Sequence, residues 1–267
     1  MSSTTVVTDW AERTAELHRE LMPQKDNLCG AFWGALVLTA AGVHGIDQDL
    51  VAQESGTLLP EGGEPPPLAG VESRVDYRLE LPLAPRPQSG TPGRGLAIAI
   101  ERLSAGRLAA VPVAGPWTAE TVAELLSLDR QMPLIANVDT GALWGASADR
   151  KQVQRHLDTG ADDGPAADWS VGHFVNPVAV QRGRGAAIVT VRDTYPALAG
   201  GVHLQPASRL AAALRRDDGR EGGVLCVCDA GRAAGLERDL AAGGLQVRHW
   251  DNGTPERLSR HGRGRRG

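Results

Sequence analysis

Hydrophobic residues recur along the chain with two different periods, and these periods predict helices and strands in different segments. Apolar residues at helical spacing predict an amphipathic helix over 9–21, which Pro23 stops. Residues 29–41 are apolar on nearly every side, so we expect a buried helix that ends at Gly42. Further helices are expected over 47–55, 95–103, 119–128, 148–157, 206–215 and 232–242.

Short β-branched or alternating runs predict the strands. The clearest pair, 173–180 and 186–192, is joined by the glycine-containing turn 181–185, which is typical of an antiparallel hairpin. Other strands are expected over 75–81, 108–113, 133–138, 224–228 and 245–250. The fold class predicted is α/β of the α+β kind, with a helical side packed on a mostly antiparallel sheet.

The distribution of proline, glycine and charge predicts one domain over residues 1–250. The proline-rich stretch 57–92 and the loop-rich stretch 139–169 are interpreted as insertions in this domain. Residues 251–267 are rich in arginine and glycine, so we expect a basic, disordered tail.

Charge and hydropathy exclude some classes of partner and compartment. Lys and Arg number 28 against 32 Asp and Glu, and this mildly acidic balance argues against a nucleic-acid partner. No apolar run approaches the length of a membrane span, and the polar N-terminus does not resemble a signal peptide. We therefore expect a cytoplasmic protein without a membrane partner, while its oligomeric state stays open.

The three cysteines fall into two different settings. Cys226 and Cys228 would face the same side of one strand, a poor geometry for a disulfide, so they are interpreted as core residues. No histidine or cysteine pair has zinc-ligand spacing, and we expect neither a metal nor a cofactor. Cys29 instead begins the buried helix, where free N–H groups and the helix dipole favour a thiolate. A buried core cysteine is the alternative at this position.

A histidine and an aspartate in the predicted hairpin strengthen the catalytic interpretation of Cys29. Folding the hairpin symmetrically about Gly183 places His173 opposite Asp193, on one face of the sheet. A base with an orienting carboxylate is what nucleophilic catalysis by a thiol requires. Pro177 lies inside the first strand, where a bulge would shift this register by one residue.

The order of these motifs resembles that of papain-like cysteine peptidases, and most closely the bacteriocin leader-peptidase (double-glycine peptidase) domains and related acyltransferases. The residues that carry the resemblance are Pro23-Gln-Lys-Asp-Asn-Leu-Cys-Gly30 with the following helix, Gly172-His-Phe-Val175, and Arg192-Asp-Thr-Tyr-Pro196. It covers roughly residues 24–229, with gaps. Gln24 stands one residue closer to the cysteine than is usual in that family, and the distance from the cysteine to the histidine is longer.

The resemblance implies a papain-like fold in which the helical side carries the cysteine and the sheet carries the histidine and aspartate. It implies that Cys29 is the nucleophile, His173 the general base and Asp193 the residue that orients His173. Gln24 would assist the Cys29 backbone N–H in stabilising an oxyanion.

Three functions are compatible with these residues. The first is a cysteine peptidase or amidase that acts on a peptide or amide through a thioester acyl-enzyme. The second is an acyltransferase or amide-forming enzyme of natural-product biosynthesis, which uses the same site and takes its acyl group from a carrier protein. The third is an inactive peptide-binding module.

Several other polar and aromatic residues have an expected role in or near the site. His203 is interpreted as structural and His44 as a surface residue. Asp26 and Asn27 precede the cysteine and are expected to cap its helix, with lining of the site as the alternative. Trp33 and Trp169 are assigned to core packing, with substrate walls as the alternative for both.

Overall fold

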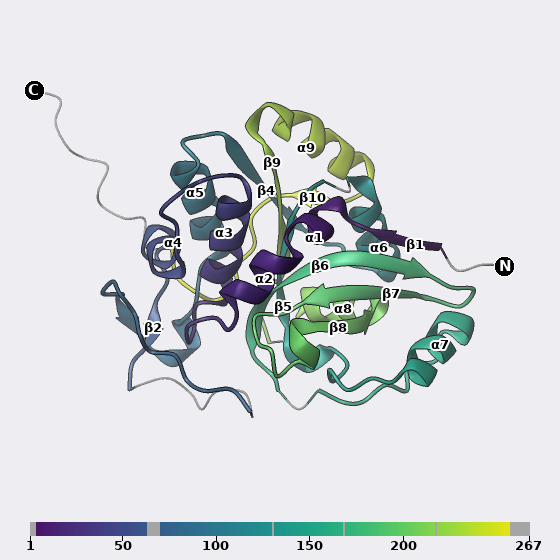
Figure 1. The fold of residues 1–267 in the computed structure, drawn as a ribbon. Coiled ribbons are helices and arrows are strands. Elements are labelled where there is room, and N and C mark those ends of the chain that lie inside the picture. The colour runs from purple at the N-terminus through teal and green to yellow at the C-terminus, as the bar shows by residue number, and fades with distance from the viewer. Residues whose placement is uncertain (1–3, 63–69, 130, 168, 217, 257–267) are drawn as a thin grey trace, which may run out of the picture.

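The computed structural model describes residues 4–62, 70–129, 131–167, 169–216 and 218–256 (Figure 1). Its helices are α1 (Asp9–Arg13), α2 (Ala15–Leu21), α3 (Cys29–Ala40), α4 (Gln48–Ser55), α5 (Gly93–Leu103), α6 (Ala119–Leu128), α7 (Arg150–Thr159), α8 (Ala207–Arg215) and α9 (Ala233–Ala242). Its strands are β1 (Thr4–Val7), β2 (Leu59–Pro60), β3 (Leu83–Ala84), β4 (Leu108–Ala114), β5 (Leu134–Asp139), β6 (Gly172–Arg182), β7 (Ala187–Arg192), β8 (Val202–Pro206), β9 (Gly223–Asp229) and β10 (Gln246–Val247).

The main sheet has the strand order β10-β4-β9-β5-β6-β7-β8, and β1 also pairs with β6. Every pairing in this sheet is antiparallel. The two short strands β2 and β3 form a separate parallel pair. The predicted α+β class with a mostly antiparallel sheet is therefore confirmed.

Helices cover both faces of the sheet, and each face has its own hydrophobic core (Figure 1). Side chains of β9 alternate between the two cores, because successive residues of a strand point to opposite faces. Val224 and Cys226 pack with α6, α8 and α9 on one face, whereas Leu225 and Val227 pack with α3, α4 and α5 on the other. Cys226 and Cys228 are buried, as expected of core residues.

Helix α3 is the central element on its face of the sheet. Its residues from Cys29 to Leu38 are all buried, which agrees with a sequence that is apolar all round. The Trp33 indole N–H donates to the Phe174 carbonyl on β6 at 2.8 Å, so the helix is tied to the strand that carries His173. Gly30 permits this close approach, since a Cβ there would lie 2.9 Å from the Thr91 Cβ and 3.1 Å from the Phe174 ring.

Three sequence expectations about secondary structure need correction. The helix expected over 9–21 is interrupted at Thr14, whose hydroxyl donates to the Trp10 carbonyl and accepts from Arg192. The strand expected over 75–81 is absent, and the Arg78 N–H there donates to the carboxylate of Asp49 instead of to another strand. The last strand is limited to β10, and strands β1 and β8 were not predicted.

The predicted boundary at residue 251 falls close to the end of the described chain. Asn252 donates to the Thr91 carbonyl and Thr254 to the Ser89 carbonyl, so the residues just after the boundary contact the stretch 57–92. Residues 257–267 of the predicted tail lie outside the described residues. Within the part of the chain that the structure describes, none of the helices is both long and apolar enough to cross a bilayer.

The close packing at Gly30 yields a prediction about stability. The Gly30→Ala substitution should lower the free energy of unfolding by about 1–3 kcal/mol, because Thr91 and Phe174 must move to admit the methyl group. Chemical denaturation measures this change. Gly231→Ala is the matched control, since a Cβ at Gly231 meets nothing within 4 Å. Equal stability of both variants and the unmodified protein would contradict the packing described.

Candidate active site

The candidate nucleophile, Cys29, is the first residue of α3. The first backbone bond of the helix joins the Phe32 N–H to the Leu28 carbonyl, so the N–H groups of Cys29 and the two residues after it have no partner within the helix. Leu28 in the N-cap position supplies no side-chain hydrogen bond. The thiol therefore lies beside free donors at the positive end of a helix dipole.

His173 and Asp193 are in contact, although the predicted register is wrong. The pairing of Asn176 with Arg192 makes Val175, and not His173, the neighbour of Asp193 across the strands. His173 is two residues from Val175 and so lies diagonally from Asp193 on the same face. The register shift between Pro177 and Ala179 confirms the expected irregularity at the proline. The His173 Nε2 is 3.1 Å from the Asp193 Oδ1.

The two buried groups stabilise each other's charged form. Burial alone would lower the pKa of His173, but the charge of Asp193, its hydrogen bond and the Cys29 side chain raise this pKa to about 10. Burial alone would raise the pKa of Asp193, but the charge and hydrogen bond of His173 hold it well below its usual range. The Asp193 carboxylate thus favours the imidazolium form of His173, and with Nε2 on Asp193 its Nδ1 is the nitrogen left for the thiol.

Two residues that sequence reasoning did not place in the site also contact Asp193. The backbone N–H of Thr194 donates to the Asp193 Oδ1 at 2.7 Å. The Nε2 of His18, on α2, lies 2.7 Å from the Asp193 carbonyl oxygen, and the His18 ring stacks on Trp33. His18 is 1% exposed in an otherwise amphipathic helix, and a histidine on that buried face is the one sequence signal that could have indicated it.

His203, which was interpreted as structural, lies on β8 with its Nε2 3.5 Å from the Asp193 Oδ2. Asp193 therefore lies between two imidazole rings. His44 is exposed, as expected of a surface residue, and Trp33 is buried in the core, as its assignment to packing predicts. Trp169 contacts the His173 ring edge-on with the ring centroids 5.0 Å apart, so it lies against the site.

Gln24 is buried against the aspartate loop, the segment that follows β7 and begins with Asp193 and Thr194. Its Oε1 accepts from the Thr194 hydroxyl at 2.6 Å, and its Nε2 donates to the Lys25 carbonyl at 3.2 Å. Its backbone N–H donates to the Thr194 carbonyl at 3.2 Å. These contacts tie the loop before Cys29 to the residue next to Asp193, and leave one amide hydrogen of Gln24 outside these bonds.

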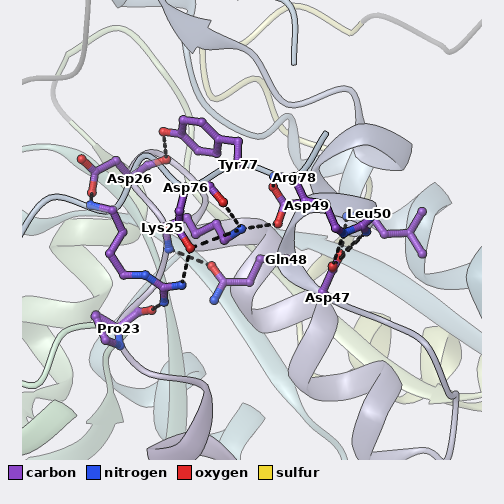
Figure 2. A network of polar contacts seen from close by, with 11 residues as sticks. Pro23, Lys25, Asp26, Asp47, Gln48, Asp49, Leu50, Asp76, Tyr77 and Arg78 are labelled. Carbon is purple, nitrogen blue, oxygen red and sulfur yellow. Dashed lines mark hydrogen bonds and ion pairs between the residues drawn. The ribbon is translucent and has the colours of Figure 1, made fainter. Parts of the chain in front are cut away.

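The loop before Cys29 is held on its other side by residues 73–78 (Figure 2). The ammonium of Lys25 binds the Asp49 carboxylate at 2.5 Å and the Asp76 carbonyl at 2.6 Å, and Asp49 also accepts from the Arg78 N–H. The Asp49 side chain is 1% exposed, so this ion pair is shielded from solvent on the carboxylate side. The stretch 57–92 thus contributes to the position of the nucleophile loop.

Asp26 and Asn27 do not cap α3, which corrects the sequence expectation. The Asp26 carboxylate accepts from the Ser73 hydroxyl and the Arg74 N–H. Its carbonyl accepts from the Tyr77 hydroxyl, as Figure 2 shows. Asn27 has a φ of 61° and donates through Nδ2 to the Leu58 carbonyl at 2.7 Å. Both side chains are turned toward the stretch 57–92 and hold it against the loop.

Neither a cavity at the far end of α3 nor a group of metal ligands is associated with Cys29 in the described residues. A cavity of about 330 Å³ lies at the opposite end of α3, with Val37, Ala41 and Cys228 in its lining. It is remote from Cys29 by about a helix length of ~18 Å, so it does not serve this thiol. Among the residues described, no three His, Cys, Asp or Glu side chains are grouped so as to hold a metal ion.

Comparison with known proteins gives a family but no activity. The model of a family of unknown function (DUF6885) matches residues 8–251, which is most of the chain. The protein belongs to this family, and the match includes all the site residues described above. A search of the curated proteins found no match.

The site predicts a difference in reactivity among the cysteines. Burial raises the pKa of Cys226, and burial likewise raises the pKa of Cys228, so both thiols resist ionisation. Iodoacetamide near neutral pH should alkylate Cys29 first, since this thiol lies beside an imidazolium. Mass spectrometry of peptides after a time course measures the three rates. Equal labelling of all three cysteines in the native protein would contradict an activated thiol.

The raised pKa of His173 predicts a loss of stability at alkaline pH. The folded-state pKa exceeds the ordinary 6.5, so the stabilisation is fully present below that pH and is lost as the pH rises toward about 10. In a Cys29→Ala background, the free energy of unfolding should fall over this range, and Asp193→Asn should make the fall smaller. Urea denaturation at several pH values measures both curves.

Asp162→Asn provides the control for this pH dependence. The exposed Asp162 pairs with Arg209. Its partial desolvation alone would raise its pKa, but hydrogen bonds from Arg209 and Trp144 lower this pKa. Its contribution to stability is lost only at acid pH, so the variant should keep the alkaline fall. Identical alkaline curves with and without Asp193→Asn would contradict the coupling between Asp193 and His173.

Proposed function

We propose that the protein is a cysteine-dependent peptidase or amidase that passes through a thioester acyl-enzyme. The observation that carries the proposal is the contact of Cys29, at the N-terminus of α3, with the imidazolium of His173, whose other nitrogen is held by the buried Asp193. An adjacent imidazolium and a helix N-terminus are the two features that turn a thiol into a nucleophilic thiolate.

In the first half of the reaction, the Cys29 thiolate attacks the carbonyl carbon of an amide and forms a C–S bond. The carbonyl electron pair moves to its oxygen, which becomes an oxyanion. As the intermediate collapses, the C–N bond breaks and His173 donates its Nδ1 proton to the leaving amine. The products of this half are a free amine, a thioester on Cys29 and a neutral His173.

In the second half, the neutral His173 accepts a proton from water while the water oxygen attacks the thioester carbon. The C–S bond then breaks, a carboxylic acid leaves, and the thiolate and imidazolium are restored. Asp193 remains ionised throughout and favours the charged form of His173. If an amine replaces water, the same thioester gives a new amide, so hydrolysis and acyl transfer differ only in the acceptor.

Two groups are candidates for stabilising the oxyanion. The Cys29 backbone N–H has no partner within α3, and such free donors are typical components of oxyanion holes. Gln24 is the second candidate, because its side chain is buried in the loop just before Cys29. Its position next to Thr194 also makes it a link between the cysteine and aspartate loops.

The arrangement supports a relationship to the papain-like enzymes. A cysteine at the start of a buried helix, facing a histidine and an aspartate on an antiparallel sheet, is the arrangement that the resemblance implies. A peptide-binding module would have no need of the ionised pair at His173 and Asp193, which is why we favour an enzyme over binding alone.

Cys29→Ala should abolish turnover and leave the fold intact, since it removes the nucleophile and one sulfur atom. Candidate peptides, amides and thioesters are incubated with the protein, and intact mass spectrometry detects an acyl adduct on Cys29. The released product, acid or amide, shows whether water or an amine is the acceptor. Full turnover by the pure variant would exclude the mechanism.

Asp193→Asn should reduce kcat by at least tenfold, because the amide retains the shape of the side chain but not the charge that favours the imidazolium. Asp193→Ala should reduce it at least as far. Circular dichroism of both variants is the control for folding. EDTA should have no effect on the rate; activity that is lost in EDTA and restored by zinc would overturn the assignment of Asp193 to His173.

A further inference from the structure

Behind Asp193 lies a line of buried polar groups, namely the Trp144 backbone, the Gln205 amide and the His203 ring. Trp144, Gln205 and His203 are 3%, 0% and 6% exposed, and each contacts the next. We propose that His203 is a positioning residue that donates its Nε2 hydrogen to Asp193, and that Gln205 holds it in this tautomer. The proposal rests on the proposed function for its role in catalysis, but not for its geometry.

The orientation of the Gln205 amide is fixed by one backbone residue. Its Oε1 accepts from the Trp144 N–H at 2.7 Å, and its Nε2 donates to the Trp144 carbonyl at 2.8 Å. Exchanging the amide oxygen and nitrogen would set donor against donor and acceptor against acceptor at both contacts. The second Nε2 hydrogen therefore points to the His203 Nδ1, 2.9 Å away.

This contact determines the tautomer of His203. A ring nitrogen that accepts a hydrogen bond carries no hydrogen, so the hydrogen of the neutral His203 ring is on Nε2. That nitrogen lies 3.5 Å from the Asp193 Oδ2 and presents its N–H toward the carboxylate. A hydrogen on Nδ1 would place two donors against each other, so the geometry favours the tautomer with its hydrogen on Nε2.

The two oxygens of Asp193 consequently have different donors. Oδ1 accepts hydrogen bonds from the His173 Nε2 and the Thr194 N–H, whereas Oδ2 faces the His203 Nε2. A carboxylate buried this deeply depends on donors for both oxygens, since an unpaired charged oxygen is costly away from water. His203 thus keeps Asp193 ionised and prevents it from rotating away from His173.

The other titratable groups near this carboxylate are already engaged. His18 contacts the backbone carbonyl of Asp193, and the Arg192 guanidinium donates to Thr14 and to the Ala11 carbonyl. The other ionisable groups beside His173 are Cys29 and Tyr195, whose ring stacks on the imidazole with the centroids 6.1 Å apart. A change in the pH profile of Cys29 on substitution of His203 therefore reports on Asp193 and His173.

The first test reads the tautomer directly. In protein labelled with ¹⁵N-histidine, NMR should show His203 with its hydrogen on Nε2 at neutral pH, and His203→Gln identifies the signal by its loss. A hydrogen on Nδ1 would overturn the proposal. This measurement needs no substrate, so it holds whether or not the protein proves to be a peptidase.

The second test reads the effect on the thiolate through the pH dependence of Cys29 alkylation by iodoacetamide. His203→Leu, which has no donor, should reduce the rate constant near neutral pH about tenfold. It should also lower the pH at which His173 deprotonates. His203→Gln keeps an N–H donor and should restore part of both losses. If His203 had only a structural role, His203→Leu would lower the stability of the protein and leave the pH profile of Cys29 alkylation unchanged.

His156→Gln is the matched control. His156 is a buried histidine whose ring also contacts Trp144, but its Nδ1 faces the Ala161 carbonyl and not the site. Its variant should keep the alkylation profile of the unmodified protein. Equal profiles of His203→Leu and the unmodified protein would overturn the proposal. A slow, unactivated Cys29 in the unmodified protein would instead refute the proposed function and leave the tautomer measurement to decide on His203.

Discussion

The arrangement of the site depends on one carboxylate, Asp193, that is buried within the fold at 1% exposure. A charge so far from water is stable only with a counter-charge and hydrogen-bond donors. The structure supplies these from separate elements: His173 from β6, His203 from β8 and the N–H of Thr194 from the loop itself. The fold and the proposed chemistry thus share one electrostatic requirement. The strands that carry the hydrogen-bond donors of Asp193 also place the His173 ring beside Cys29.

The nucleophile is positioned by a second set of constraints that act on the loop before α3. On one side Gln24 binds Thr194, next to Asp193, and on the other Lys25 binds Asp49 and the stretch around Asp76. The loop is therefore fixed between the residues that follow β7 and residues 73–78, and Figure 2 shows the contacts on the second of these sides. This gives the proline-rich stretch 57–92 a physical role, since its Leu58 carbonyl and Arg74 N–H hold the side chains of Asn27 and Asp26, which do not cap α3.

Periodicity and turn chemistry sufficed to predict the elements that carry the site. The all-round apolar 29–41 segment, the β6–β7 hairpin and the proximity of His173 to Asp193 follow from local sequence. The exact register did not, because the turn is centred between Arg184 and Gly185 instead of on Gly183, and the bulge after Pro177 shifts the pairing again. Residues 75–81 alternate like a strand but bind carboxylates of other elements, and His18 and His203 reach Asp193 only through tertiary packing. Such contacts leave no periodic signal in one sequence.

The net charge of the site bears on how Cys29 is activated, but not on which acceptor its thioester would use. The imidazolium of His173 and the carboxylate of Asp193 together carry no net charge, so formation of a thiolate leaves the site with a single negative charge on sulfur. That state suits attack on any polarised carbonyl and does not distinguish an acid product from an amide product. The activating pair therefore does not itself distinguish water from an amine as acceptor, and the aromatic side chains that border the imidazole are Trp169, which lies edge-on to His173, and Tyr195, whose ring stacks on it with the centroids 6.1 Å apart.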